Sequence, residues 1–279
     1  MNNKEYFLDE FNNPIPIHTK DAFIGMRKAG QLASRVLDYI GQFVNEGVST
    51  GELDKLCHNF ITSNKAIPAP LNYKGFPKSI CTSVNHVVCH GIPGEKILRN
   101  NDILNIDVTV ILDNWHGDTS RMFAVGKPKI KAKRLIDVTF NSMWEGIKQI
   151  KPGNTAGDIG YAIQSFAEYH GYSVVRDFCG HGIGKKFHSP PNILHYGNKN
   201  EGIELREGMF FTVEPMINVG KRDVTILEDG WTAITKDRTL SAQYEHTVGV
   251  TSDGFEVFTT SRHTEAREHG GFGGRRSFD

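Results

Sequence analysis

The sequence predicts an α/β (α+β) fold made of two duplicated halves related by a pseudo-two-fold axis. Three observations lead to this prediction. Apolar and polar residues alternate along residues 104–112 and a turn follows, which is typical of a β-hairpin. The segments on both sides of the hairpin repeat apolar residues with the spacing of amphipathic helices. Two pairs of segments, separated by 106 and 107 residues, match each other in sequence, which indicates an internal duplication.

Composition limits the classes of protein to consider. The chain has 279 residues, enough for one large domain or two small ones. Its 32 basic and 32 acidic side chains cancel, so no net charge attracts nucleic acid or a membrane surface. We find no apolar run of membrane-spanning length and no signal peptide. The four cysteines form no C-x-x-C pair, which predicts reduced thiols in a cytoplasmic protein and argues against a thiolate zinc site.

The segments before the hairpin show helical periodicity, a capping signature and a proline- and glycine-rich region. The expected elements are an extended arm at residues 1–18, a helix with its apolar face at 29–44 that ends at Gly47, a helix that begins at the capping-box pair Ser49 and Glu52, and loops at 66–96 around a strand at 79–88.

The hairpin at residues 104–123 carries two aspartates. A two-residue turn at 113–114 would place Thr109 opposite Asp118, so that Asp107 and Asp118 become diagonal neighbours on the polar face. Two carboxylates on the inner face of a sheet repel each other unless a cation lies between them. The hairpin alone therefore leaves two interpretations open, a metal-binding pair and a solvated face.

The segments after the hairpin alternate between helical and strand patterns, and a glycine-rich tail follows. The expected elements are helices at 130–150 and after the capping residues 155–158, strands at 173–177, 209–214, 224–227, 232–234, 241–250 and 256–259, a glycine-rich turn at 180–184, and a disordered tail at 263–279.

The internal repeat relates two carboxylates. Residues 47–53 match residues 153–159, and residues 98–107 match residues 205–214. Asp107 and Glu214 therefore occupy equivalent positions in the two halves. A duplicated fold with a carboxylate at this position in each half predicts a site on the pseudo-two-fold axis.

Three further residues extend the candidate site. Glu214 ends an apolar strand, and Glu245 lies among polar neighbours on one strand face, as Asp107 does. His181 lies between glycines, which let a backbone approach a ligand closely. Each residue alone is equally typical of a surface or loop position, but the set, together with Asp118, favours a metal site.

Several motifs together resemble the type I methionine aminopeptidases of the M24 metallopeptidases. The motifs are the His-Gly-Ile-Pro sequence at 90–93, the Asp107 and Asp118 hairpin, Gly-His-Gly at 180–182, the Glu214-Pro pair and Glu245. The resemblance covers residues 20–259. It implies the pita-bread fold, a curved antiparallel sheet covered by helices, in a single catalytic domain at residues 19–262 with repeated halves near 20–125 and 130–260.

The resemblance also implies a dinuclear metal centre. The ligands would be Asp107, Asp118, His181, Glu214 and Glu245, which would hold two divalent ions such as cobalt, manganese, iron or zinc. Asp118 and Glu245 would bridge the ions, and a metal-activated hydroxide would attack the scissile carbonyl. Glu214 would also shuttle the proton, and His90 and His188 would bind substrate and the tetrahedral intermediate.

The methionine side chain would bind in a pocket formed by Tyr73, Phe76, Cys81, Phe187 and Trp231, since sulfur packs well against aromatic edges. The family often has tyrosine at the position of Phe76 and cysteine at the position of Pro70, so the pocket departs from the family pattern at these two positions.

The implied function is removal of the N-terminal methionine from nascent polypeptides with a small second residue, by a cytoplasmic monomer for which the ribosome is a candidate partner. One alternative is a proline-specific aminopeptidase or dipeptidase, although these usually carry a larger N-terminal domain. A second is a non-catalytic binding protein of the same fold, which would have lost ligands. A non-haem oxygenase would need two histidine ligands, and only His181 is available.

Overall fold

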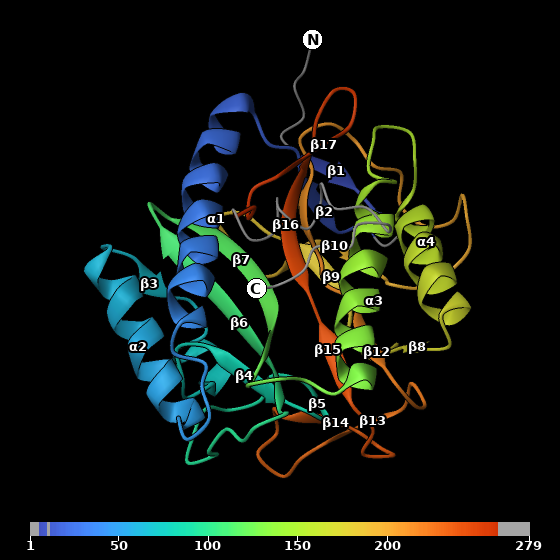
Figure 1. Cartoon of the computed structure of the whole chain (residues 1–279). Helices are drawn as coiled ribbons and strands as arrows, with labels where there is room; N and C mark the ends of the chain where they lie inside the picture. The colour runs from blue at the N-terminus through green and yellow to red at the C-terminus, as the bar shows by residue number, and fades with distance from the viewer. Residues whose placement is uncertain (1–5, 10–11, 262–279) are drawn as a thin grey trace, which may run out of the picture.

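A curved antiparallel sheet forms the centre of the molecule, and two pairs of helices cover its outer face (Figure 1). This computed structural model describes residues 6–9 and 12–261. Helices α1 (Lys20–Gly41) and α2 (Thr50–Ser63) cover the first half, and α3 (Ile130–Ile147) and α4 (Ala156–Tyr169) cover the second. Within the described ranges, no helix is long and apolar enough to cross a membrane. The predicted tail at 263–279 lies outside the described residues.

The central sheet has nine strands in the order β10-β9-β11-β16-β7-β6-β3, with β17 paired to β16 and β4 paired to β6. Their bounds are β3 Ile67–Pro68, β4 Cys81–Val84, β6 Ile103–Leu112, β7 Trp115–Ala124, β9 Gly180–Gly182, β10 Ser189–Ile193, β11 Phe210–Val213, β16 Glu245–Val250 and β17 Phe255–Val257.

Three small sheets flank the central sheet. They pair β1 (Tyr6–Leu8) with β2 (Pro14–Pro16), β12 (Met216–Asn218) with β15 (Ser241–Gln243) and β8 (Ser173–Val174), and β14 (Ala233–Thr235) with β13 (Val224–Ile226) and β5 (Val87–Cys89). A single 3-10 turn, η1 (Tyr73–Gly75), lies in the loop after β3.

The β6–β7 hairpin has the predicted register, with Leu112 opposite Trp115 and Thr109 opposite Asp118. Both turn residues have positive φ, 50° for Asp113 and 67° for its neighbour, as two-residue hairpin turns require. The apolar face of β6 is buried in the core beneath α1 and α2 from Leu104 to Val110, and Leu112 at its end is partly buried. The opposite face is therefore fixed in position and presents its aspartates to the concave side of the sheet.

The predicted duplication is visible as the same set of contacts in each half. Ser49 forms an isolated bridge with Ile97, and Thr155 forms one with Glu204, at positions 106 and 107 residues later. Ser49 and Thr155 each begin a capping box, in which the backbone N–H of the capping residue donates to a carboxylate three residues on. The two halves are thus built on one pattern, as a pseudo-two-fold fold requires.

Several predicted boundaries are wrong because strands change sheets. The expected strand at 241–250 is divided at Tyr244, since β15 joins a small sheet while β16 joins the central sheet. The expected strand at 79–88 is likewise divided into β4 and β5, which belong to different sheets. Alternation persists through the bend at Tyr244, so the pattern of apolar residues does not reveal it, whereas the polar pair Asn85-His86 interrupts the pattern between β4 and β5.

Other differences have local causes. Helix α1 ends at Gly41 and not at Gly47, because the side-chain amides of Gln42 and Asn45 donate to carbonyls of its last turn. The expected arm folds back on itself, so that β1 and β2 form a hairpin. The glycine-rich segment at 180–184 begins as a strand, β9, and β10 and β12 were not expected at all.

Candidate metal centre

The concave face of the sheet holds a cavity of about 550 Å³ that contains every candidate site residue predicted from the sequence. The predicted metal ligands, the two histidines and the pocket residues all line it. They are Asp107, Asp118, His181, Glu214, Glu245, His90, His188, Tyr73, Phe76, Cys81, Phe187 and Trp231. The structure brings all of these residues to one cavity, and their roles as ligands, substrate-binding groups and pocket walls remain predictions.

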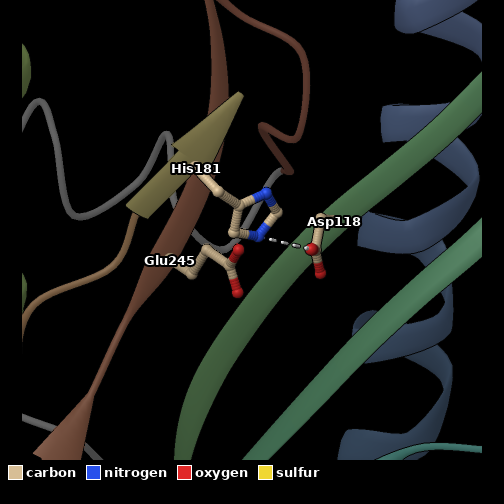
Figure 2. Close-up of side chains that lie close together, drawn as sticks. All are labelled: Asp118, His181 and Glu245. Carbon is tan, nitrogen blue, oxygen red and sulfur yellow. Dashed lines mark ion pairs between the residues drawn. The ribbon is translucent and has the colours of Figure 1, made fainter. Parts of the chain in front are cut away.

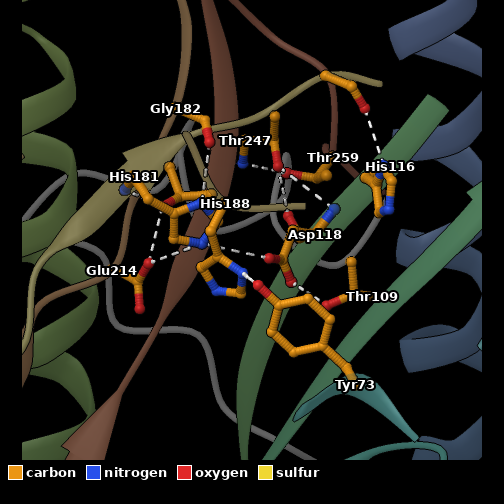
Figure 3. A network of polar contacts seen from close by, with 12 residues as sticks. Tyr73, Thr109, His116, Asp118, His181, Gly182, His188, Glu214, Thr247 and Thr259 are labelled. Atoms are coloured by element: carbon orange, nitrogen blue, oxygen red, sulfur yellow. Dashed lines mark hydrogen bonds and ion pairs between the residues drawn. The ribbon is translucent and has the colours of Figure 1, made fainter. Parts of the chain in front are cut away.

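Three of these side chains form the centre of the cavity. Asp118 on β7, His181 on β9 and Glu245 on β16 each offer a ligand atom within 4.8 Å of the others (Figure 2). All three are nearly inaccessible to solvent, at 3%, 9% and 3% exposure. Nε2 of His181 points between Asp118 and Glu214, 3.6 Å from a carboxylate oxygen of each (Figure 3).

Hydrogen bonds fix the orientation of Glu214, which directly follows β11. Its Oε1 accepts a 2.7 Å hydrogen bond from the hydroxyl of Thr212, and its Oε2 accepts one of 3.3 Å from Gln243. Its backbone N–H donates to Nε2 of the buried His195 at 3.0 Å. The carboxylate is therefore held in one orientation before any ligand binds.

The carboxylates of the centre are in an unfavourable environment for negative charge. Burial raises the pKa of Asp107 to about 7 and that of Glu214 to about 8, and the charge of Asp107 adds to the shift at Glu214. Burial also raises the pKa of Asp118 and Glu245 well above the usual range, and repulsion from neighbouring carboxylates adds to both shifts. Without a cation the centre thus favours the protonated forms of these carboxyls, and a bound cation would favour their charged forms.

A divalent cation fits this centre. Lys74, at the rim, is the one lysine or arginine among the described residues that line the cavity, so the protein supplies little compensating charge. Burial lowers the pKa of His181 to about 4, so its imidazole is neutral and can donate a lone pair. Four carboxylates and a neutral imidazole are donors that suit first-row divalent ions, and the residues present therefore fit the metal that the sequence predicts.

Two further histidines face the same cavity. Nδ1 of His188 lies 2.9 Å from the hydroxyl of Tyr73, and its ring centroid lies 4.1 Å from that of His181 (Figure 3). His90 has a positive φ of 56°, and its ring contacts that of Phe178 edge to face. Burial lowers the pKa of His188 to about 3 and also lowers that of His90, so both rings are neutral.

The expected methionine pocket is an aromatic wall on one side of the cavity. Phe76 and Trp231 meet edge to face with ring centroids 5.2 Å apart, and Tyr73 and Phe187 lie 4.8 Å apart. Burial, with the charge of Asp107 adding to it, raises the pKa of the Cys81 thiol well above its usual range. Cys81 is therefore a neutral wall of the pocket and a poor nucleophile.

Sequence reasoning missed several residues around the centre. Cys179, Phe178 and Met216 line the cavity, and the buried side chains of His195 and Gln243 contact Glu214. Cys179 lies in the glycine-rich motif that contains His181, so that motif could have indicated it. The other four occupy no distinctive pattern, because only the folded chain brings them to the cavity.

Comparison with protein-family models defines the class of protein, a metal-dependent peptidase. Residues 24–252 match the family model described as Metallopeptidase family M24. The chain is 64% identical over 248 residues to a methionine aminopeptidase of Rickettsia prowazekii, covering 88% of this chain and 96% of the relative. It is 52% identical over 247 residues to the methionine aminopeptidase of Escherichia coli, covering 88% and 94%. The chain therefore belongs to the methionine aminopeptidases of family M24.

Solved structures confirm the fold. The crystal structure of methionine aminopeptidase from Rickettsia prowazekii superposes with a TM-score of 0.88 at 64% identity, covering 88% of this chain and all of that one. The enzyme from Thermotoga maritima gives a TM-score of 0.87 at 34% identity and 88% coverage. The pita-bread fold, a curved antiparallel sheet with four covering helices, is thus the fold of this chain.

Proposed function

We propose that this metal-dependent methionine aminopeptidase uses two divalent ions, and that it prefers substrates with a small second residue. One observation carries the proposal: five oxygen and nitrogen donors from both halves of the chain meet in one buried cleft. Asp118 and Glu245 would bridge the ions, Asp107 would complete the coordination of one, and His181 with Glu214 that of the other. Bound divalent ions would supply an activated water and polarise the scissile carbonyl.

Glu214 is proposed to move the proton. The carboxylate would accept a proton from the attacking water and deliver it to the nitrogen of the leaving amine. Thr212 and Gln243 hold its two oxygens at 2.7 and 3.3 Å, so the carboxylate need not reorient between the two transfers. This supports its assignment as proton shuttle as well as ligand.

His188 and His90 are proposed to bind the peptide. Because the Tyr73 hydroxyl engages Nδ1 of His188, Nε2 of that ring is left to contact the substrate. His90 lies beside Trp231, with ring centroids 6.3 Å apart, at the border between the polar centre and the aromatic pocket. The two rings would therefore hold the peptide bond while the aromatic wall holds the methionine side chain.

The second substrate residue would lie beside the crowded histidines. The ring centroid of His188 lies 4.1 Å from those of both His181 and Phe187, and these three rings would limit the length of a side chain bound beside them. This crowding supports a preference for alanine or serine over lysine at that position. The proposal also includes a monomeric, cytoplasmic enzyme, with the ribosome as a candidate partner.

Peptide cleavage with controlled metal content tests the proposal. The chelator-treated protein should regain hydrolysis of Met-Ala-Ser when manganese, iron, cobalt or zinc is added, and should cleave Met-Lys-Ser far more slowly. Calorimetric titration should show two metal ions per chain at saturation. Binding of a single ion would contradict the dinuclear assignment, and cleavage of Ala-Pro-Ser would favour the proline-specific alternative.

A further inference from the structure

Strand β10 (Ser189–Ile193) leads away from the metal centre along the edge of the central sheet. Its residues alternate, with Pro191 and Ile193 buried while Asn192 and, just after the strand, Leu194 are exposed. The exposed side chains lie on one face of the strand, as the two-residue period of a strand requires. Moving outward from the metal centre, a ligand would therefore meet first the polar side chain of Asn192 and then the apolar side chain of Leu194.

A second cavity of about 580 Å³ lies at the far end of this strand. Its walls include Phe7 of the N-terminal hairpin and Gly157 at the start of α4. Pro190 and Asn192 line both this cavity and the cavity of the metal centre. The two cavities therefore adjoin at β10, and together they would form a groove that begins at the proposed catalytic site.

The outer cavity is acidic. The carboxylates of Asp9, Glu201 and Glu204 line it, and among the described residues its walls include no lysine, arginine or histidine. Glu204 also lies 3.7 Å from the guanidinium of Arg206, which stacks on Phe7 and offsets part of this negative charge. The groove would therefore attract a positively charged ligand.

We propose that this groove binds the polypeptide substrate downstream of its first two residues, and that it favours lysine or arginine there over glutamate or aspartate. This inference rests on the proposed function. Four extended residues of a substrate cover roughly 13 Å at about 3.3 Å per residue, so the groove would take substrate positions about four to seven. The occupant is the substrate itself because the outer cavity adjoins the site where its N-terminus would react.

Peptides of two lengths and three charges test this inference. Met-Ala-Ser reports on the metal centre alone, and Met-Ala-Ser-Gly-X-X-X-Gly-Ser, with X as lysine, glutamine or glutamate, extends into the groove. At low ionic strength the lysine peptide should exceed the glutamate peptide in kcat/KM by about 10-fold, and added salt should shrink the ratio.

Charge-removing variants locate the effect. The double variant Glu201→Gln/Glu204→Gln should reduce the lysine-to-glutamate ratio to about 2-fold. Glu46→Gln/Glu95→Gln removes two exposed carboxylates from the other half of the molecule and serves as the matched control, which should keep the wild-type ratio. Leu194→Lys places a cation in the groove and should lower the ratio further.

The outcomes separate the two proposals. Equal kcat/KM for the lysine and glutamate peptides in the wild-type protein, or an unchanged ratio in the double variant, would overturn the groove while Met-Ala-Ser is still cleaved. Failure to cleave Met-Ala-Ser in the presence of metal would instead overturn the proposed function. Cleavage of Met-Ala-Ser by each variant shows that the variant has folded.

Discussion

Thr109 donates a 2.7 Å hydrogen bond to Oδ1 of Asp118 across the β6–β7 hairpin (Figure 3). The two residues are directly opposite each other in the strand register, and both are buried. The hydroxyl occupies one oxygen of Asp118 while the other faces His181. Neighbours of this kind orient metal ligands in proteins.

Thr109→Val should therefore weaken metal binding without unfolding the protein. Loss of a hydrogen bond to a ligand typically costs 10- to 100-fold in metal affinity. Thr109→Ser keeps the hydroxyl and should restore most of the affinity. Calorimetric titration of both variants checks this, and equal affinity for the valine and serine proteins would show that the contact has no part in orienting Asp118.

Asp118→Asn should have a larger effect, because it removes a proposed bridging ligand. We expect a fall of at least about 100-fold in both metal affinity and Met-Ala-Ser hydrolysis. Asp113→Asn changes an aspartate in the turn of the same hairpin and should leave both unchanged. Full metal content and normal turnover in Asp118→Asn would contradict the dinuclear assignment.

His188→Ala should slow the reaction while metal content stays normal. Positioned acid–base or hydrogen-bonding groups typically contribute 10²–10⁴-fold, so kcat/KM should fall by roughly 100-fold or more. Tyr73→Phe removes the hydroxyl from Nδ1 and should give a smaller loss in the same direction. If His188→Ala kept the wild-type kcat/KM, His188 would have no part in the reaction and would be only a loop residue.

The metal-free protein should lose stability as the pH rises from 7.5 to 9. The folded pKa of Asp107, about 7, and that of Glu214, about 8, are raised above their unfolded values. Such groups stabilise the fold at low pH, and this contribution is lost as the pH rises through the folded pKa. Above pH 7.5 the buried histidines, whose pKa values are lowered in the fold, are neutral in the unfolded chain as well, since their unfolded pKa is about 6.5, and they do not oppose the trend.

Urea unfolding in the presence of a chelator measures this loss. We expect the free energy of unfolding to fall by roughly 1–3 kcal/mol between pH 7.5 and 9. Glu214→Gln, which carries no charge to bury, should flatten the dependence. Stability that instead increases over this range would show that the carboxylates are not in the environment described here.

The two helix caps offer a test of the duplication. Ser49→Ala and Thr155→Ala each remove a capping side chain at equivalent positions, and each should lower the free energy of unfolding by about 1 kcal/mol. The losses should add in the double variant because the sites lie in different halves. Ser63→Ala, at the last residue of α2, serves as a control and should have little effect.

Local patterns predicted some features accurately because short-range chemistry determines them. The register of β6 and β7 follows from alternation and a two-residue turn, and both caps follow from a side chain three residues away. The change of sheet at Tyr244 depends instead on which distant strands are available as partners. No property of the residues at 241–250 encodes that choice.

The same division applies to the site. Asp107 and Asp118 could be paired from the sequence because one hairpin carries both. Gln243 and His195 could not be placed beside Glu214, since they contact it only through the folded sheet. The similarity of motifs to a known family gave the complete set of predicted ligands. The two cavities that adjoin at β10 became visible only in the structure, because no motif indicates them.

The pairing of β7 with β16 joins the two duplicated halves, at Ser120 with Glu245 and at the neighbouring Thr119 with His246. Each half contributes candidate metal ligands. Asp107 and Asp118 precede α3, and His181, Glu214 and Glu245 follow it. Metal affinity and association of the halves are therefore one linked equilibrium. If the chain were cut in the exposed linker before α3, the two fragments should reassemble more tightly when a divalent ion is present.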